Sequence, residues 1–315
     1  MKTCMTEPRR HHIVTQGYLK GFCFGPIGKE RFCVYDFKRW RKAQPLNEAI
    51  ENDFQTLDHF IGLDPYYLEK EFSVVEGLAV DVIRKIVLTK RLPDTIKEFS
   101  PVINLMGIFA GRNLTTRKMV NELWKQSSMK KLELIHANES IYYSHMEKIR
   151  AADMSKEPII PYEKSKAFLD SKKFEIRTDP SLVVEEMAKM TASMVDRLGN
   201  RNWMLVESIG AEFITSNKPV NAAWAIGFQP FVPGFGLINS LVIFPISPHL
   251  ALIGSWSPLP TYRQVDFFVV EGINWVTANS GATTLYAKSQ TYLPAFLGLF
   301  YLQEFHRFLS TRLIK

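Results

Sequence analysis

One stretch of the chain constrains the fold more than any other: residues 221–260 contain no Lys, Arg, Asp or Glu. Proline and glycine divide these residues into short apolar runs such as Leu241–Phe244 and Leu250–Ile253. Short uncharged runs between turn residues are typical of strands that are buried on both faces of a sheet. The sequence therefore predicts a buried sheet in the second half of the chain.

The first half of the chain shows helical periodicity. Between Leu68 and Arg91 apolar residues recur every three or four positions, and Pro93 ends the run. A second helix is predicted from about Ser100 to Lys125, with Ser100 as its N-cap and proline in its first turn. A third helix is predicted over about Met129–Ala151.

The remaining elements are predicted from shorter signals. Arg31–Phe37 alternates like a strand, with Lys38–Lys42 as its turn. Trp203–Glu207 and Ala211–Ser216 are predicted to form a hairpin joined at Ile209-Gly210. The other predicted elements are a helix from Asp179-Pro180 that closes at Gly199-Asn200 with a left-handed cap, a helix over Tyr262–Asn279, a strand over Thr284–Lys288 and a C-terminal helix from Pro294.

This order of elements predicts an α+β fold in which a helix-rich N-terminal half packs on a mixed or antiparallel sheet formed largely by the C-terminal half. We expect one large domain over residues 1–315. Its predicted parts are an N-terminal hairpin with helices (10–150), a linker or excursion (152–180), and the sheet with further helices (181–315).

Charge and cysteine content indicate the setting of the protein. The net charge is +7, and residues 1–50 contribute +6 of it, so the N-terminal region is expected to attract polyanions such as nucleic acid. Only Cys4, Cys23 and Cys33 are present, which indicates reduced thiols. The absence of an apolar signal core and of a clean 18-residue apolar run predicts a cytoplasmic protein without an integral membrane segment.

Standard catalytic motifs are missing from the sequence. It contains no G-x-x-x-x-G-K-[ST], no G-x-G-x-x-G after a strand, no H-E-x-x-H, no C-x-x-C pair and no G-x-S-x-G. Nucleotide cofactors, zincin chemistry and ordinary esterase chemistry are therefore not expected.

The first candidate site residues are His11, His12 and Gln16. Adjacent side chains diverge by about 100° on a helix and about 180° on a strand, so one histidine can bind a metal ion or act as a base while the other points elsewhere. His12 and Gln16 share a face if the segment is helical. A surface turn that carries two histidines beside Arg9 and Arg10 is the competing interpretation.

A second group of candidates is acidic. Glu51 and Asp53 lie two residues apart and project to one side of an extended segment, as a divalent cation site requires. Glu76 follows an apolar position of the first long helix and is a candidate buried acid. A solvated turn and an ordinary helix flank are the competing interpretations.

The third group comprises basic and amide or hydroxyl side chains. Arg112 and Arg117 are candidate phosphate ligands, or residues of a solvated helix face. Ser216 and Asn217 end a predicted strand, where site residues often lie. A capped turn before Pro219 is the alternative.

Taken in order, these residues form a longer pattern. It contains His11-His12, Gln16-x-Tyr18-Leu19-x-x-Phe22, Glu51-x-Asp53-Phe54, Glu76, Arg112, Arg117, Phe213 to Ser216-x-x-Pro219-Val220, Phe244 to Ser247-Pro248, and Asn274 followed by a strand at Ala282. The pattern resembles the domain of unknown function 4238 family, typically bacterial proteins of about this length, and it covers about residues 10–290. The resemblance implies a single large domain with a shared polar site that includes Asn274, and it implies no named reaction.

The sequence departs from the family pattern at three positions. Thr15 replaces the usual proline, Gln55 the usual tyrosine and Asn217 the usual aspartate. Asn217 removes a negative charge, and with it a cation ligand or general base. If that aspartate is catalytic in the family, this protein is expected to be a weakened or inactive homologue.

Two functions follow as hypotheses. The first is a metal-assisted phosphodiesterase that acts on nucleic acid with Mg²⁺ or Mn²⁺. Its expected metal ligands are His12, Glu51 and Asp53, its catalytic residues are His12, Glu76, Arg112 and Asn217, and its substrate-binding residues are His11, Gln16, Arg117, Ser216 and Asn274.

The second hypothesis is a non-catalytic protein that binds nucleic acid or a small ligand in a bacterial regulatory or defence system. In it, the same polar residues form a buried network that ties the N-terminal segment to the helices and the sheet. A peripheral membrane protein that uses Trp224, Phe228, Phe231 and Phe235 is a weaker third hypothesis, because this stretch lacks a basic amphipathic helix. The sequence does not determine the oligomeric state.

Overall fold

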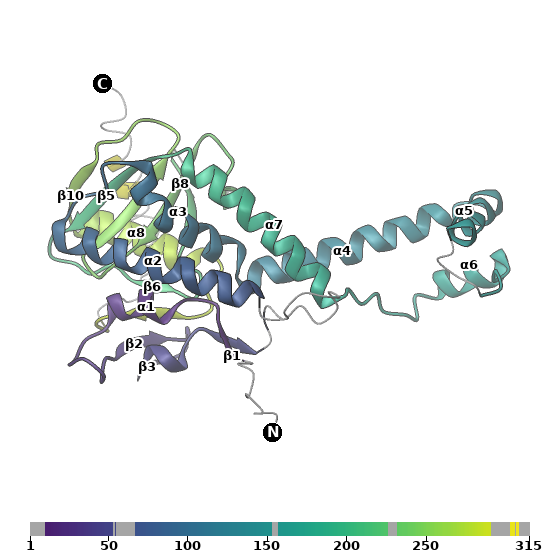
Figure 1. Ribbon diagram of the computed structural model, residues 1–315, viewed down its shortest axis with the longest axis horizontal. Helices are drawn as coiled ribbons and strands as arrows, with labels where there is room; N and C mark the ends of the chain where they lie inside the picture. The colour runs from purple at the N-terminus through teal and green to yellow at the C-terminus, as the bar shows by residue number, and fades with distance from the viewer. Residues whose placement is uncertain are drawn as a thin grey trace. The chain divides into compact units, whose positions relative to one another are not determined.

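The computed structural model describes residues 10–52, 54, 67–152, 157–225, 232–290, 303–305 and 307–308. Helices dominate the first half of the chain and strands the second, so the predicted α+β class is confirmed (Figure 1). The contacts divide the chain into two compact units. The first combines Met1–Thr116 with Met187–Lys315, and the second is Arg117–Glu186. The single domain that we predict over 1–315 stays a prediction.

The centre of the first unit is a five-stranded sheet with the strand order β10-β5-β9-β8-β7. All neighbouring strands run antiparallel except β10 and β5, which are parallel. The strands are β5 (Asn202–Ser208), β7 (Asn221–Trp224), β8 (Ser240–Pro245), β9 (Leu250–Ser255) and β10 (Tyr262–Val265). Three of them come from the uncharged stretch 221–260, and every residue of β8 and β9 is buried.

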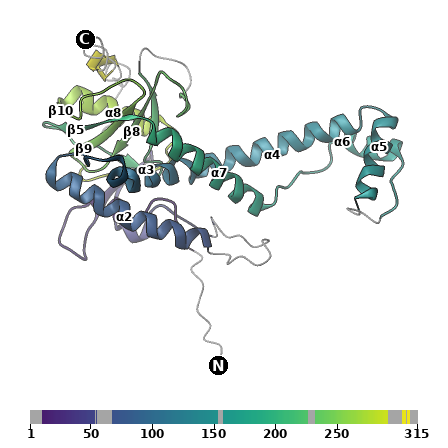
Figure 2. The same ribbon diagram turned by 45° about the horizontal axis from the view of Figure 1, so that its top comes forward.

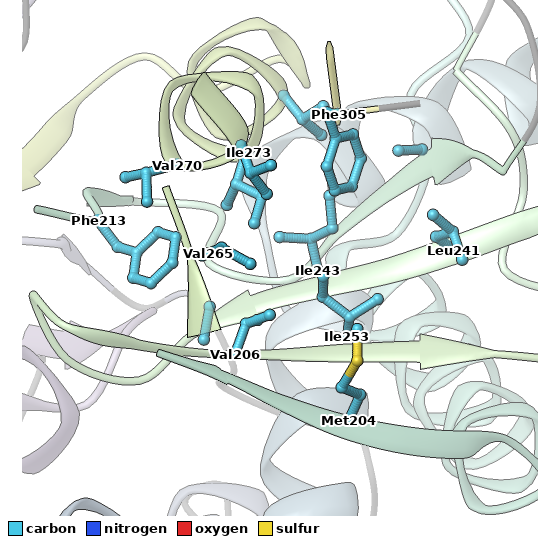
Figure 3. Close-up of a cluster of buried hydrophobic side chains, with 14 residues drawn as sticks. Met204, Val206, Phe213, Leu241, Ile243, Ile253, Val265, Val270, Ile273 and Phe305 are labelled. Atoms are coloured by element: carbon cyan, nitrogen blue, oxygen red, sulfur yellow. The ribbon is translucent and has the colours of Figure 1, made fainter. Parts of the chain in front are cut away.

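One face of this sheet packs on helix α8 (Phe267–Asn279). Alternate strand residues such as Val206, Ile243 and Ile253 meet Val270 and Ile273 of the helix (Figure 3). Asp266 caps α8 by accepting a hydrogen bond from the backbone N–H of Val269 at 3.2 Å. The two-residue alternation of a strand leaves the intervening residues for the opposite face, which explains why β8 and β9, buried on both faces, carry no charge.

Helices α2 (Tyr67–Thr89) and α3 (Ile96–Gly111) lie on the opposite side of the sheet from α8 (Figure 2). Aromatic contacts join α3 to this face: the ring centroids of Phe99 and Trp203 are 5.8 Å apart, and those of Phe109 and Phe244 are 6.2 Å apart. Thr95, and not Ser100 as predicted, is the N-cap of α3, because its side chain accepts the Glu98 N–H.

Helix α7 (Pro180–Gly199) ends where we predict, and within the first unit it packs closely on α3. A Cβ atom added to Gly111 would lie 2.1 Å from Oγ1 of Thr191, and one added to Gly107 would lie 2.4 Å from Cγ2 of Val195. The two glycines therefore permit this approach of the helices. The left-handed cap predicted for α7 is wrong: neither Gly199 nor Asn200 has a positive φ, and the Asn200 side chain donates to the Asp196 carbonyl instead.

A second sheet joins distant parts of the sequence in the order β3-β2-β11-β6. Strands β2 (Phe32–Tyr35) and β3 (Trp40–Ala43) form a hairpin, and β2 also pairs with β11 (Leu285–Ala287), which pairs with β6 (Thr215–Ser216). The predicted turn Lys38–Lys42 is thus partly the strand β3. A separate ribbon pairs β1 (Arg10–His12) with β4 (Ile50–Asn52).

The second unit is helical. Helix α4 (Leu114–Ile135) runs through the break that we predict between Lys125 and Met129, and the chain breaks instead at Arg112-Asn113, where the Asn113 side chain accepts the Thr116 N–H at 2.9 Å. Helices α5 (Glu139–Ala151) and α6 (Tyr162–Ser171) follow. The helix α6 lies inside the predicted linker 152–180, where the broken periodicity does not indicate it.

Two further predictions fail because the sheet partners are not neighbours in sequence. The predicted hairpin at Ile209-Gly210 does not form: β5 pairs with β9 and β10, while β6 belongs to the other sheet. The predicted helix over Tyr262–Asn279 begins only at Phe267, because residues 262–265 form β10. The predicted helix from Pro294 lies largely outside the described residues; Gln303–Phe305 and Arg307–Phe308 within it are helical.

Candidate functional site

The motif that opens the family pattern folds as a strand followed by one helical turn, α1 (Gln16–Leu19), and a 3₁₀ turn, η1 (Lys20–Phe22). The side chains of Tyr18, Leu19 and Phe22 are at most 2% exposed. The Tyr18 ring stacks on Phe244 at 5.2 Å between centroids and meets the edge of Phe109 at 5.3 Å. This part of the motif is hydrophobic core that anchors the N-terminal segment between α3 and the five-stranded sheet.

The Tyr18 hydroxyl makes the anchor specific. It donates to the Pro245 carbonyl and shares a hydrogen bond with Oγ1 of Thr215, each at 2.6 Å. Burial raises the pKa of Tyr18, so the phenol stays protonated and keeps its donor. One side chain thus connects α1 to strands of both sheets.

Arg112 is the centre of the polar cluster that we predict. It follows α3 directly, its side chain is 3% exposed, and it donates to Oε1 of Glu76 at 2.9 Å and to Oε2 of Glu69 at 3.1 Å. Its guanidinium also donates to the backbone carbonyl of His12 and lies over the Phe72 ring at 5.4 Å from the centroid. Two carboxylates therefore offset its charge, and it fixes the position of the N-terminal segment.

These contacts bring together four of the predicted site residues, His12, Gln16, Glu76 and Arg112. Nε2 of Gln16 lies 2.8 Å from Nε2 of His12, and Thr15 hydrogen bonds to Glu76. Burial raises the pKa of Glu76, while the Arg112 charge acts in the opposite direction. We call Arg112, Glu76, Glu69, His12 and Gln16 the Arg112 cluster.

The predicted metal ligands do not converge in the described residues. His11 lies directly opposite Glu51 in the β1–β4 ribbon, and His12 lies opposite Ile50, so the His12 and Glu51 side chains project from opposite faces. Asp53 lies outside the described residues. Nowhere in the described ranges do three His, Cys, Asp or Glu side chains gather closely enough to hold a metal ion. The Mg²⁺ or Mn²⁺ site stays a prediction.

Among the other predicted site residues, Asn217, Asn274 and Ser216 make hydrogen bonds that hold backbone segments in place. Asn217 accepts the N–H groups of Thr283 and Thr284 and donates to the Thr283 hydroxyl, so it shapes the turn before β11. Asn274 is fully buried and ties α8 to the Glu212–Ile214 backbone. Ser216 closes its own turn through Lys218, and Arg117 belongs to the second unit.

The β2–β3 hairpin, Phe32–Ala43, forms a further charged surface, which we call the basic hairpin. It lies at the margin of the first unit (Figure 1). Strand β3 is the edge of its sheet. The side chains of Lys38, Arg39 and Lys42 are exposed and make no ion pair with any described residue, whereas Arg41 is held by Glu48 at 2.5 and 2.9 Å. In the sequence, the run Phe-Lys-Arg-Trp-Arg-Lys at 37–42 is the feature that indicates this basic surface.

Comparison with known proteins identifies the family to which the chain belongs. No helix in the described part of the chain has both the length and the apolar character needed to cross a membrane. No curated protein and no solved structure matches this chain. The family model described as a protein of unknown function, DUF4238, matches residues 10–291. The buried Tyr18 anchor and the Arg112 cluster lie within that match, and the chain belongs to this family.

Proposed function

We propose that this protein binds nucleic acid through the basic hairpin. The observation that carries the proposal is the charge of this surface: Lys38, Arg39 and Lys42 project into solvent and form no ion pair among the described residues, although Asp36 attracts Arg39. Cations that are not already neutralised are free to bind phosphates and to release the counterions of a polyanion, which is the main source of sequence-independent affinity for nucleic acid.

The local carboxylates support this interpretation because they are already engaged. Glu48 holds Arg41, and Asp36 accepts the backbone N–H groups of Lys38 and Arg39 at 3.0 and 2.8 Å. These backbone bonds lower the pKa of Asp36, and its carboxylate stabilises the turn. Lysines on an edge strand also prevent pairing with other chains. That role needs charge on β3 itself, and it does not explain Lys38 and Arg39 in the turn.

The test replaces the three cations together by Lys38→Gln, Arg39→Gln and Lys42→Gln. The probes are fluorescein-labelled 20-nucleotide DNA and RNA, and anisotropy is measured between 50 and 200 mM NaCl. We expect the variant to bind at least about tenfold more weakly at 50 mM NaCl, with a salt slope shallower by about 0.7 for each phosphate that it no longer neutralises.

A second triple variant controls for net charge. Lys85→Gln, Arg91→Gln and Lys97→Gln remove three exposed cations of the same unit from α2, from the segment after it and from α3. Its affinity and salt slope should stay close to the wild-type values. Equal losses in both triple variants, or no binding by the wild type at 50 mM NaCl, would refute the proposal.

Hydrolysis of the bound nucleic acid with a divalent metal is a second candidate, and the observation that favours it is the raised pKa of Glu76 in contact with Arg112. A buried carboxyl group of this kind is suited to act as a general acid. Cleavage of labelled DNA and RNA should then require Mn²⁺, be stopped by chelator and be lost in His12→Ala. Cleavage indifferent to both chelator and substitution would reject this mechanism.

A further inference from the structure

We propose that the basic hairpin is specific for single-stranded nucleic acid, whose bases stack on Phe37 and Trp40. The inference rests on the proposed nucleic-acid binding and adds the class of nucleic acid. It comes from the aromatic side chains of the hairpin, whereas the proposed function comes from its cations.

Three aromatic rings form a row on the hairpin. Tyr35 and Trp40 are directly opposite each other in the β2–β3 ladder, so their side chains lie on one face, and their rings stack at 5.0 Å between centroids. The Phe37 ring in the turn lies 5.6 Å from the Tyr35 ring. Phe37 is 42% exposed, whereas Tyr35 and Trp40 are half-buried and pack against the core cluster of Ile214, Ala278, Leu285 and Ala287, so Phe37 is the most open ring of the row and only part of Trp40 reaches solvent.

The backbone at Phe37 shows that the position of this ring has a cost. Its φ is +64°, in the left-handed region that glycine and asparagine adopt readily and that a bulky residue rarely occupies. Such a conformation is unfavourable for a residue with a Cβ, and it persists here because Asp36 fixes the turn through two backbone N–H groups. The turn thereby holds a ring that contacts Tyr35 and leaves 42% of Phe37 exposed at the end of the hairpin.

Cations flank the aromatic row in a repeating order. Lys38 and Arg39 stand in the turn between Phe37 and Trp40, and Lys42 projects from the same face as Trp40, two residues further along β3. Nζ of Lys42 lies 5.5 Å from the centroid of the Phe24 ring. Alternating rings and cations along a strand match a chain of alternating bases and phosphates.

This arrangement selects unpaired bases. Bases in a duplex are already stacked on each other and show only their edges in the grooves, whereas a single strand can lay its base faces on exposed rings. A duplex would therefore contact only the cations. An acidic peptide or an anionic lipid surface would use the cations as well, and neither has flat rings to match Phe37 and Trp40.

The decisive variant is Phe37→Gly. Glycine removes the ring and also relieves the positive φ, which offsets part of the lost packing against Tyr35. Thermal unfolding of the variant checks that a loss of binding does not arise from unfolding. Trp40→Leu tests the other end of the row, and Phe37→Trp should retain binding. The probes are labelled dT₁₅, rU₁₅ and a 15-base-pair DNA duplex, in 100 mM NaCl.

We expect wild type to bind both single strands more tightly than the duplex. Phe37→Gly and Trp40→Leu should each weaken single-strand binding by roughly 5- to 150-fold, the range of one stacked base. Their duplex affinity and their salt slope should not change, whereas the triple cation variant loses affinity for all three probes.

The outcomes separate this inference from the proposed function. Equal binding of single strands and duplex, together with no effect of Phe37→Gly, overturns the single-strand inference and leaves nucleic-acid binding in place. Absence of binding to all three probes overturns both. Binding to phosphatidylglycerol vesicles that is lost in Phe37→Gly, without binding to the oligonucleotides, assigns the surface to lipid and also overturns both.

Discussion

Arg112 illustrates how residue types that indicate catalysis also serve architecture. A buried arginine is stable only when carboxylates and hydrogen-bond acceptors surround its guanidinium, and Glu76, Glu69 and the His12 carbonyl provide them. The same contacts hold β1 and α1 against α2 and α3. The Arg112 cluster thus combines a structural function with Glu76, the partly buried acid that the proposed hydrolysis would use.

We predict that Arg112→Met lowers the free energy of unfolding by about 3–5 kcal/mol, because it leaves two partly buried carboxylates without their cation. Urea unfolding followed by circular dichroism measures this change. Arg84→Met is the matched control: its partner Asp81 lies at 3.2 Å on the exposed surface, and the expected cost is about 0–1 kcal/mol. Similar costs for both variants would contradict the role of the cluster.

Asp36 gives the basic hairpin a predictable pH dependence. Hydrogen bonds from the backbone N–H groups of Arg39 and Lys38 lower the pKa of Asp36 below its ordinary value of 3.8. A lowered pKa stabilises the folded turn above the unfolded pKa, and this contribution disappears as the pH falls through the lower folded pKa. The turn should therefore loosen below about pH 4.

Backbone amide exchange or NMR shifts of residues 36–40 between pH 6 and pH 2 follow this transition. Asp36→Asn keeps an acceptor that does not titrate, so its turn should lose the transition, while the wild type should show it. An identical pH profile in both proteins would show that Asp36 does not control the turn.

At this scale the sequence predicted residue types better than roles. It singled out His12, Gln16, Glu76 and Arg112, which do meet, because polar residues beside apolar stripes must find partners when the stripe is buried. It did not predict that Arg112 would donate a hydrogen bond to the backbone carbonyl of His12. Nor did it predict the backbone partners of Asn217 and Asn274, since partners some 60 residues away leave no local signal.

At the scale of elements, the approach of α3 to α7 depends on glycine. At Gly111 a methyl group would meet not only the Thr191 hydroxyl but also its Cα at 3.0 Å, so rotating the threonine side chain cannot relieve the overlap. Helical sequence patterns indicate which face of a helix is apolar, and small residues on that face indicate where a second helix comes close.

We predict that Gly111→Ala destabilises the protein by about 1–3 kcal/mol through overpacking against α7. Gly77→Ala is the control, because Gly77 lies inside α2 and a Cβ added there meets nothing within 4 Å. Alanine lowers the conformational entropy of the unfolded chain, so this variant should be more stable than the wild type by about 0.4–1 kcal/mol. Thermal unfolding of the two variants should shift in opposite directions. A shift of the same sign in both would contradict the close contact.

Element boundaries were predictable where a residue acts locally. Pro93 and Pro180 mark helix boundaries as expected, but the continuous α4 and the strand β10 were missed. Residues 262–265 form a strand because they pair in parallel with β5. The sequence of residues 262–265 does not show that β5 is available as a partner.

At the scale of the whole molecule, each compact unit has its own internal ties. In the second unit, Nδ1 of His136 bonds to the Leu132 carbonyl at 2.8 Å and Nε2 bonds to the Ser165 hydroxyl at 2.7 Å, joining α4 to α6. Because the carbonyl can only accept, Nδ1 is the donor in the bond to Leu132.

We predict that His136→Ala destabilises the second unit by about 2 kcal/mol, because it removes both bonds and leaves a small cavity beside Tyr142. Hydrogen exchange measured by mass spectrometry should show faster exchange in residues 132–171 and unchanged exchange in β8 and β9. His249→Ala, at an exposed histidine of the first unit, is the control. Equal acceleration in both units would show that they unfold as one.

The sequence by itself determined the fold class and the buried sheet of residues 240–255, because periodicity and the absence of charge act over a few neighbouring residues. Tertiary structure alone decided that the hairpin at 32–43 completes a sheet with residues 215–216 and 285–287, that His12 and Glu51 face apart, and that Phe37 and Trp40 reach solvent beside exposed cations. These facts depend on strand register and on partners far along the chain, and register is fixed only when the whole core is assembled.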